Sequence, residues 1–223
     1  KTQSVALADL DGDGLLDVIA GNIGDQSVSL FEANYVYYNT GDPLMPFGTG
    51  GSAGTALDSA VQEESRRVVT GDLDNDGDID MVFLNESFDN QRNRVYLNRL
   101  AQGFPERFTH FEISPSGGNA DIDNSHGGAL GDLNGDGFLD LVVINFSVTE
   151  QSKIYLNDGS GLANVNPFTV AATAFTVGGP NSDPTFAKAA TLADSDNDGD
   201  LDIFMDIAGH EFRNRVYLND GTG

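Results

Sequence analysis

Acidic side chains recur at alternate positions in four short segments of the chain. The segments cover residues 9–17, 72–80, 132–140 and 194–202, and they share the pattern Asp-x-Asp/Asn-x-Asp-Gly-x-x-Asp. They start at residues 9, 72, 132 and 194, so successive starts are 63, 60 and 62 residues apart. Carboxylates at alternate positions converge when the chain curls around one point, and glycine at the sixth position permits the bend because it tolerates a positive φ. We call these segments loops one to four.

The donor atoms of these loops suit a hard divalent cation. The first, third, fifth and ninth positions offer side-chain oxygens, and the seventh offers its backbone carbonyl. Such a set supplies the six or seven oxygen ligands that calcium takes, whereas magnesium demands a tighter octahedral geometry. The predicted ligands are Asp9, Asp11, Asp13, Leu15 and Asp17; Asp72, Asp74, Asp76, Asp78 and Asp80; Asp132, Asn134, Asp136, Phe138 and Asp140; and Asp194, Asp196, Asp198, Asp200 and Asp202. We therefore expect about four calcium ions, one per repeat.

The loops differ from an EF-hand after their ninth position. An EF-hand needs a bidentate Glu at position twelve, whereas the twelfth residues here lie inside apolar runs and are Ala20, Phe83, Val143 and Met205. Asp- and Gly-rich turns without a metal are the other alternative, and they are disfavoured because crowded carboxylates repel and raise one another's pKa values. Four calcium ions would carry +8 and change the net charge from -24 to -16. We expect calcium to stabilise the fold.

The composition argues against several classes of function. The chain has 223 residues with 35 acidic and 11 basic side chains, and its net charge of -24 argues against nucleic acid and against an anionic membrane surface. Its apolar runs are shorter than the roughly 20 residues that span a bilayer, so no membrane insertion is expected. The absence of cysteine excludes disulfides, zinc–thiolate sites and cysteine nucleophiles.

Short apolar runs precede and follow each loop. A third run, Arg/Lys-Val/Ile-Tyr-Leu-Asn, follows loops two to four, with a weaker version in repeat one; these runs lie at residues 94–98, 153–157, 215–219 and 28–31. A fourth run contains phenylalanine and lies near Phe47, near Phe108 and within residues 168–175. The runs are β-branched, aromatic and bounded by Gly, Asn and Asp, which predicts strands. The basic residues that flank the third run are expected to pair with aspartates; they are Arg92, Arg94, Arg99, Arg213 and Arg215.

Four short strands per unit of about 62 residues are typical of a β-propeller blade. The loops, the strand before each of them and the element Arg-Val-Tyr-Leu-Asn-Asp-Gly-x-Gly at residues 215–223 resemble FG-GAP or VCBS-type repeats. Similar repeats form the calcium-bearing blades of integrin α-subunit propellers and occur in many bacterial secreted proteins. The resemblance covers nearly the whole chain. It implies a β-propeller with calcium between the first two strands of each blade, in an extracellular or cell-surface setting.

We therefore predict an all-β fold of propeller blades in tandem. Its four four-stranded repeats cover approximately residues 1–63, 64–123, 124–185 and 186–223, and the last blade is incomplete. Residues 1–223 are expected to form a single propeller-type domain that is part of a longer protein.

We expect a secreted or cell-surface calcium-binding module for adhesion or for recognition of a protein or a glycan, with calcium in a structural role. One alternative is a scaffold or catalytic domain of a carbohydrate-active enzyme, such as a polysaccharide lyase. Another is a structural subunit of an extracellular assembly or filament, which self-associates through the incomplete last blade. No catalytic motif is found and the three histidines do not recur between repeats, so no enzyme is expected. The non-repeated segments at residues 34–65, 114–125 and 178–185 are expected to hold the specific ligand.

Overall fold

A computed structural model shows only β-strands as regular elements in the residues it describes. These residues are 1–23, 32–48, 54–57, 63–86, 92–100, 107–113, 124–147, 151–157, 159, 166–168, 173–175, 185–208 and 214–221, without the side chains of residues 147, 173–175 and 185. The strands are β1 (Thr2–Ala8), β2 (Asp17–Asn22), β3 (Tyr35–Tyr37), β4 (Thr55–Ala56), β5 (Ser65–Gly71), β6 (Asp80–Asn85), β7 (Arg94–Asn98), β8 (Phe108–Glu112), β9 (Ser125–Gly131), β10 (Asp140–Ser147), β11 (Ser152–Tyr155), β12 (Thr173–Phe175), β13 (Thr185–Ala193), β14 (Asp202–Ile207) and β15 (Arg215–Tyr217). The all-β prediction is confirmed over this part of the chain, which contains no helix long and apolar enough to cross a membrane.

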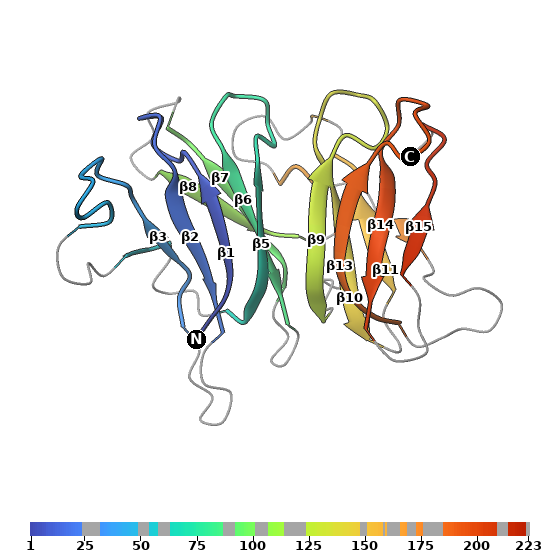
Figure 1. Cartoon of the computed structure of the whole chain (residues 1–223), viewed down its shortest axis with the longest axis horizontal. Helices are drawn as coiled ribbons and strands as arrows, with labels where there is room; N and C mark the ends of the chain where they lie inside the picture. The colour runs from blue at the N-terminus through green and yellow to red at the C-terminus, as the bar shows by residue number, and fades with distance from the viewer. Residues whose placement is uncertain are drawn as a thin grey trace.

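The strands pair antiparallel, mostly in the order of the sequence. β1 to β4 form one sheet and β5 to β8 form another. β9 to β12 repeat the pattern, and the pairing of β10 with β13 joins them to β14 and β15 in a seven-stranded sheet. We call these four groups units one to four, with unit four made of β13, β14 and β15. Figure 1 shows the units side by side along the long axis of the molecule, in a propeller-like array.

The second strand of unit two shows why the strands are apolar on both faces. Alternate side chains of a strand point to opposite sides of the sheet. Met81 and Phe83 of β6 pack in a cluster with unit one, whereas Val82 and Leu84 pack in a cluster with unit three. All four side chains are completely buried. A strand that is covered on both sides needs a continuous apolar run, which is what the sequence of β6 supplies.

Each acidic loop connects the first strand of a unit to the second. The pairing of Ala8 with Asp17, and of Gly71 with Asp80, places the two ends of a loop opposite each other. Each loop is therefore the tip of a β-hairpin. Figure 1 shows the four tips at the same edge of the array, at the top of the view.

An asparagine, buried in units two and three and half-buried in unit four, ties each of these units to the loop of the unit before it. The side-chain N–H of Asn98, at the end of β7, donates to the carbonyl of Leu10 in loop one at 2.9 Å. The equivalent bonds are 2.7 Å long, and they run from Asn157 to Leu73 and from Asn219 to Leu133. The recurrence of Tyr-Leu-Asn in the sequence thus has a structural reason, because its last residue joins neighbouring units.

Two strands of the first repeat do not lie where the sequence predicted them. Residues 28–31 lie outside the described residues, and the strand that pairs with β2 is β3. The fourth strand is β4, not the run around Phe47. Phe47 directly follows Pro46, which has no N–H to donate to a sheet. The carbonyl of Pro46 instead accepts the N–H of Thr40 at 2.7 Å in a turn.

The fourth strands of units two and three lie where the phenylalanines predicted them. β8 begins at Phe108, and β12 lies within residues 168–175. Unit four has three strands among the described residues. The division of one domain into four repeats at the boundaries given above stays a prediction.

Candidate metal centre

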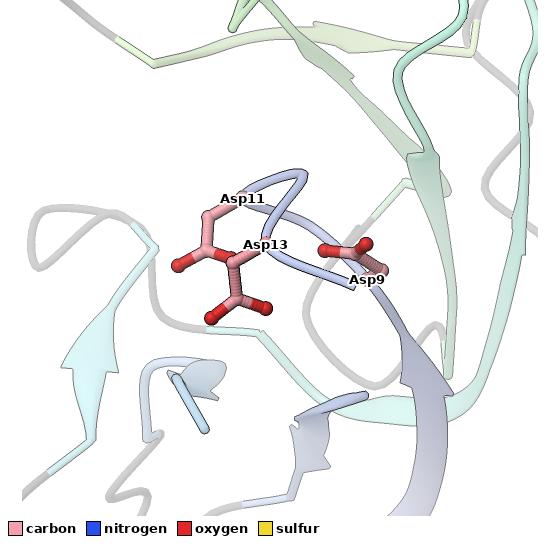
Figure 2. Close-up of side chains that lie close together, drawn as sticks. All are labelled: Asp9, Asp11 and Asp13. Atoms are coloured by element: carbon pink, nitrogen blue, oxygen red, sulfur yellow. The ribbon is translucent and has the colours of Figure 1, made fainter. Parts of the chain in front are cut away.

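Three carboxylates meet in loop one. Asp9, Asp11 and Asp13 each place one carboxylate oxygen within 4.8 Å of the others, and Figure 2 shows their side chains around the loop. The backbone supports this arrangement, because the N–H groups of Gly12 and Gly14 each donate to the Asp9 carboxylate at 2.8 Å. One oxygen of Asp11 is buried and has no hydrogen-bond partner. The cluster therefore offers several negatively charged oxygens to a single cation.

Two backbone positions in each loop adopt a left-handed conformation. At the sixth position the φ angles are 86°, 95°, 90° and 102°, for Gly14, Gly77, Gly137 and Gly199. At the fourth position they are 72°, 54°, 73° and 63°, for Gly12, Asn75, Gly135 and Asn197. This region is open to glycine and tolerated by asparagine, so the residue types at these two positions follow from the curl of the loop.

The same hydrogen bonds shape all four loops. The first aspartate accepts the N–H of the sixth-position glycine, at 2.8, 3.0, 2.9 and 3.2 Å for Asp9, Asp72, Asp132 and Asp194. The fifth-position aspartate accepts the N–H of the seventh residue, at 2.8, 2.8, 2.9 and 3.1 Å for Leu15, Asp78, Phe138 and Asp200. These bonds give the four loops one common backbone scaffold.

The aspartate at the ninth position fastens each loop to the body of its unit. Asp17 is completely buried, and its two oxygens accept the N–H of Leu10 at 2.9 Å and the N–H of Asn39 at 2.8 Å. Asp80, Asp140 and Asp202 accept the two equivalent N–H groups in their own units. The sequence predicted these four aspartates as calcium ligands. The hydrogen bonds show a structural role for each of them, and their coordination of calcium stays a prediction.

Burial raises the pKa of carboxyl groups in more than one loop. Burial, together with the charges of Asp74 and Asp76, raises the pKa of Asp80 to about 8, although two backbone hydrogen bonds lower it. Burial also raises the pKa of Asp11 in loop one and that of Asp140 in loop three. A bound cation would favour the charged form of all these carboxyl groups.

The loops do not all gather the same positions. In loops one and four, the carboxylates at the first, third and fifth positions lie together; in loop four these belong to Asp194, Asp196 and Asp198. In loop two, the carboxylates at the first, third and ninth positions lie together, and they belong to Asp72, Asp74 and Asp80. In loop three the third position is Asn134, whose amide donates to Asp136 at 3.0 Å. The predicted convergence of alternate acidic residues therefore holds most directly for loops one and four.

Loop two also contains a positive charge from the protein itself. Nη1 of Arg99 lies 2.6 Å from a carboxylate oxygen of Asp74. The sequence predicted that the basic residues pair with aspartates, but it did not connect Arg99 with an acidic loop. The signal was present in the repeat, because Asn98-Arg99-Leu100 stands where repeats three and four have Asn-Asp-Gly.

A cavity of about 550 Å³ lies between units one and two. Its walls include Tyr38, Thr55, Leu57, Arg107, Phe108 and His110. The guanidinium carbon of Arg107 lies 5.0 Å from the ring centre of Tyr38, and this arginine also donates to the carbonyl of Leu10. Part of this wall falls in the non-repeated segment at residues 34–65, whereas the part from unit two was not predicted. The segments at residues 114–125 and 178–185 lie outside the described residues, except for residues 124–125 and 185.

Three overlapping segments of the chain match the family model described as FG-GAP-like repeat. They cover residues 9–83, 72–143 and 132–205. Each segment begins at the first aspartate of an acidic loop and ends in the second strand of the next unit, so the matched repeat contains two successive loops. Together they span residues 9–205, and the chain belongs to the FG-GAP-like repeat family.

Two particular proteins are similar to this chain. Cartilage acidic protein 1 from Xenopus tropicalis is 28% identical over 171 residues, which are 73% of this chain and 23% of that protein. The solved structure of a lectin from Agrocybe aegerita, described for its specific recognition of non-reducing terminal N-acetylglucosamine, is 19% identical with a TM-score of 0.57. The alignment covers 98% of this chain and 50% of the lectin chain. This chain thus corresponds to about a quarter of the first protein and half of the second, and the likeness to the lectin shows the fold alone.

Proposed function

We propose that this chain is a calcium-binding recognition module of propeller type, in a secreted or cell-surface protein, and that its calcium ions have a structural role. The observation that carries the proposal is the convergence of Asp9, Asp11 and Asp13 on a backbone scaffold that recurs in the other loops. Membership of the FG-GAP-like family supports it, and so does the similarity to cartilage acidic protein 1.

The donor set of the loops fits calcium better than a transition metal. All side-chain donors in loops one and four are carboxylate oxygens, and the chain has no cysteine. Oxygen-only sites of high charge are those that calcium prefers, whereas zinc and copper select imidazole and thiolate ligands. The buried oxygen of Asp11, which lacks a hydrogen-bond partner, would instead coordinate the cation.

Calcium is tested by counting bound ions and measuring thermal unfolding. Native mass spectrometry is expected to show calcium that a chelator removes. Each occupied site is expected to stabilise the fold by about 2.7 kcal/mol at a hundredfold excess over its dissociation constant, which amounts to about 5–10 °C for a chain of this size. Asp11→Asn should lower the ion count by one. Asp206→Asn removes the same charge from an exposed residue of β14 and should leave the count unchanged.

A melting temperature that is equal in calcium and in chelator would refute the calcium proposal. An equal loss of calcium in the Asp11→Asn and Asp206→Asn variants would assign the ions to general surface charge instead of the loops.

A glycan is the ligand class to test first, and the cavity between units one and two is its proposed site. A volume of about 550 Å³ is in the range of small-molecule sites. Its wall combines aromatic rings with the cationic Arg107, a combination that suits an acidic sugar. A lectin of similar fold is described as recognising N-acetylglucosamine, which is the reason for testing a glycan first; a protein ligand is the alternative.

A glycan array tests this site. Arg107→Gln should abolish binding of the glycans that the unaltered chain retains, whereas Arg67→Gln, on an exposed residue of β5, should preserve it. Glycan binding that survives Arg107→Gln would place the ligand elsewhere.

We also propose that the module is not an enzyme, because its sequence contains no catalytic motif. Release of unsaturated products from pectin or alginate fragments would contradict that.

Self-association through unit four is a second candidate function. Val216 in β15 is 50% exposed, and Leu218 directly after it is 65% exposed, so apolar side chains are presented at this end of the array. Sedimentation velocity at increasing protein concentration should then show dimers or longer assemblies. Val216→Asp should shift them towards the monomer. A monomer at all concentrations would eliminate this candidate.

A further inference from the structure

Arg99 brings a fixed positive charge into loop two. Its Nη1 lies 2.6 Å from Oδ2 of Asp74, which occupies the third position of the loop. The side chain of Arg99 is 0% exposed and that of Asp74 is 4% exposed, so water screens the pair little. The backbone N–H of Arg99 donates to the carbonyl of Arg107 at 2.7 Å. The arginine is therefore held in place by its backbone as well as by its ion pair.

Unpaired polar atoms surround this contact. Nε and Nη2 of Arg99 and Oδ1 of Asp74 are buried without a hydrogen-bond partner. Burying an arginine with two unused donors costs free energy unless nearby negative charge compensates it. Asp72, one of whose carboxylate oxygens lies within 4.8 Å of one of Asp74, supplies such charge. The acidic cluster of loop two thus already has a positive partner.

The corresponding residues in other units differ from Arg99 in charge and burial. Thr40 of unit one and Asp220 of unit four are exposed, and Asp158 lies outside the described residues. The residue that follows is a glycine with φ of 73°, 67° and 75° in repeats one, three and four, namely Gly41, Gly159 and Gly221. In repeat two it is Leu100. Repeat two therefore departs from the common sequence at two adjacent positions, Arg99 and Leu100. The side chain of the first, Arg99, reaches into loop two.

A calcium ion in loop two would compete with Arg99 for Asp74. It would also lie beside a guanidinium group that is buried and always charged, and like charges repel strongly where water is excluded. We propose that Arg99 takes the place of calcium in loop two, so that three of the four loops bind calcium and loop two keeps its shape without it. The inference rests on the proposed calcium function of the other loops.

The backbone scaffold of loop two is complete around the arginine. Asp72 accepts the N–H of Gly77 at 3.0 Å, and Asp76 accepts that of Asp78 at 2.8 Å, as in the other loops. Asp80 accepts two backbone N–H groups from inside. A loop with an internal cation and this full set of bonds has no need of a metal for its order.

The amide spectrum of the unaltered, isotope-labelled chain provides a separate reporter for each loop. The sixth-position glycines donate to the first aspartate of their loops and are Gly14, Gly77, Gly137 and Gly199. During a calcium titration we expect the resonances of loops one, three and four to shift, and that of Gly77 to require at least tenfold more calcium. A Gly77 resonance that shifts together with the others overturns the proposal. Four unresponsive glycines would refute the calcium function itself, and the proposal with it.

Exchange of the arginine tests the cause. Arg99→Asp restores the Asn-Asp sequence of repeats three and four, and we expect Gly77 to respond with the other glycines and the ion count to rise from three to four by native mass spectrometry. Arg99→Lys keeps the charge and should leave three ions. Arg67→Asp makes the same change of charge on an exposed residue and should leave Gly77 unresponsive. A folded Arg99→Asp chain that still binds three ions contradicts the proposal. If that variant does not fold, the titration of the unaltered chain decides alone.

Discussion

Replacement of Asn157 by alanine tests whether the asparagines at the ends of the third strands hold the units together. Asn157 is completely buried. Its side-chain N–H groups donate to the carbonyl of Leu73 in the preceding unit at 2.7 Å and to that of Leu139 in its own unit at 3.3 Å. Alanine removes both bonds and leaves the two carbonyls without this donor.

The expected cost follows from these contacts. A buried hydrogen bond contributes about 1–1.5 kcal/mol and a buried acceptor left without a donor costs about 1–3 kcal/mol, so Asn157→Ala should lower the free energy of unfolding by about 3 kcal/mol. For a chain of this size the melting temperature should fall by about 6–12 °C. The matched control is Asn39→Ala, because Asn39 holds the same position in unit one and its side-chain N–H donates to Leu16 of its own unit, at 3.2 Å, and not to a neighbouring unit among the described residues. We expect less than about 1 kcal/mol for this control.

Urea unfolding at one fixed calcium concentration measures both variants. The asparagine bonds between units would be of no energetic importance if Asn157→Ala and Asn39→Ala lowered the free energy of unfolding equally. A changed urea dependence in Asn157→Ala would show, in addition, that the units no longer unfold together.

Phe83→Ala empties a completely buried site between units one and two, and it should cost about 3–5 kcal/mol in urea unfolding, whereas Leu44→Ala at 86% exposure should cost less than about 0.5 kcal/mol. Gly77→Ala adds a Cβ with nothing within 4 Å, so its expected cost of about 1–2 kcal/mol in the free energy of unfolding would come from the positive φ alone. Asn75→Gly should change the free energy of unfolding by less, and a larger change in Asn75→Gly than in Gly77→Ala would contradict this reasoning. Because the pKa of Asp80 is raised to about 8 in the folded state, its contribution to stability is full below about pH 4 and is lost as the pH rises through about 8. Melting temperatures of the calcium-free chain between pH 5 and 8 should therefore fall less steeply in Asp80→Asn, and equal slopes would refute the assignment.

The local features of the repeat could be predicted from the sequence because they depend on neighbouring residues. The acidic loops, the strands beside them and the Tyr-Leu-Asn runs of repeats two to four follow from residue type and spacing alone. The third strand of repeat one was missed because its sequence, Tyr35-Val36-Tyr37-Tyr38-Asn39, lacks the leucine and the basic residue of the other copies. It keeps the alternation of buried and less buried side chains, since Val36 is 1% exposed and packs against unit two, between the half-buried Tyr35 and Tyr37.

Contacts between units could not be predicted in the same way. Arg107 lies over the ring of Tyr38, which belongs to another unit and is far away in the sequence. The contact of Arg99 with Asp74 lies within one unit, but the two residues are 25 positions apart and their contact depends on how the end of β7 passes the loop. Spacing identifies which residues repeat, whereas the partner of a residue that departs from the repeat is known only from the folded chain.

The asparagine bonds between units all run the same way along the chain, from a later unit to the loop of the unit before it. Loop one receives its bond from Asn98 in unit two, and loop two receives its bond from Asn157 in unit three. Each of these loops is therefore completed by residues that leave the ribosome more than eighty positions later, since the bonded pairs are 88 and 84 residues apart. During synthesis, the hydrogen bond from a new unit to the loop of the preceding unit can form only after the new unit has emerged. The units are therefore joined in order from the N-terminal end.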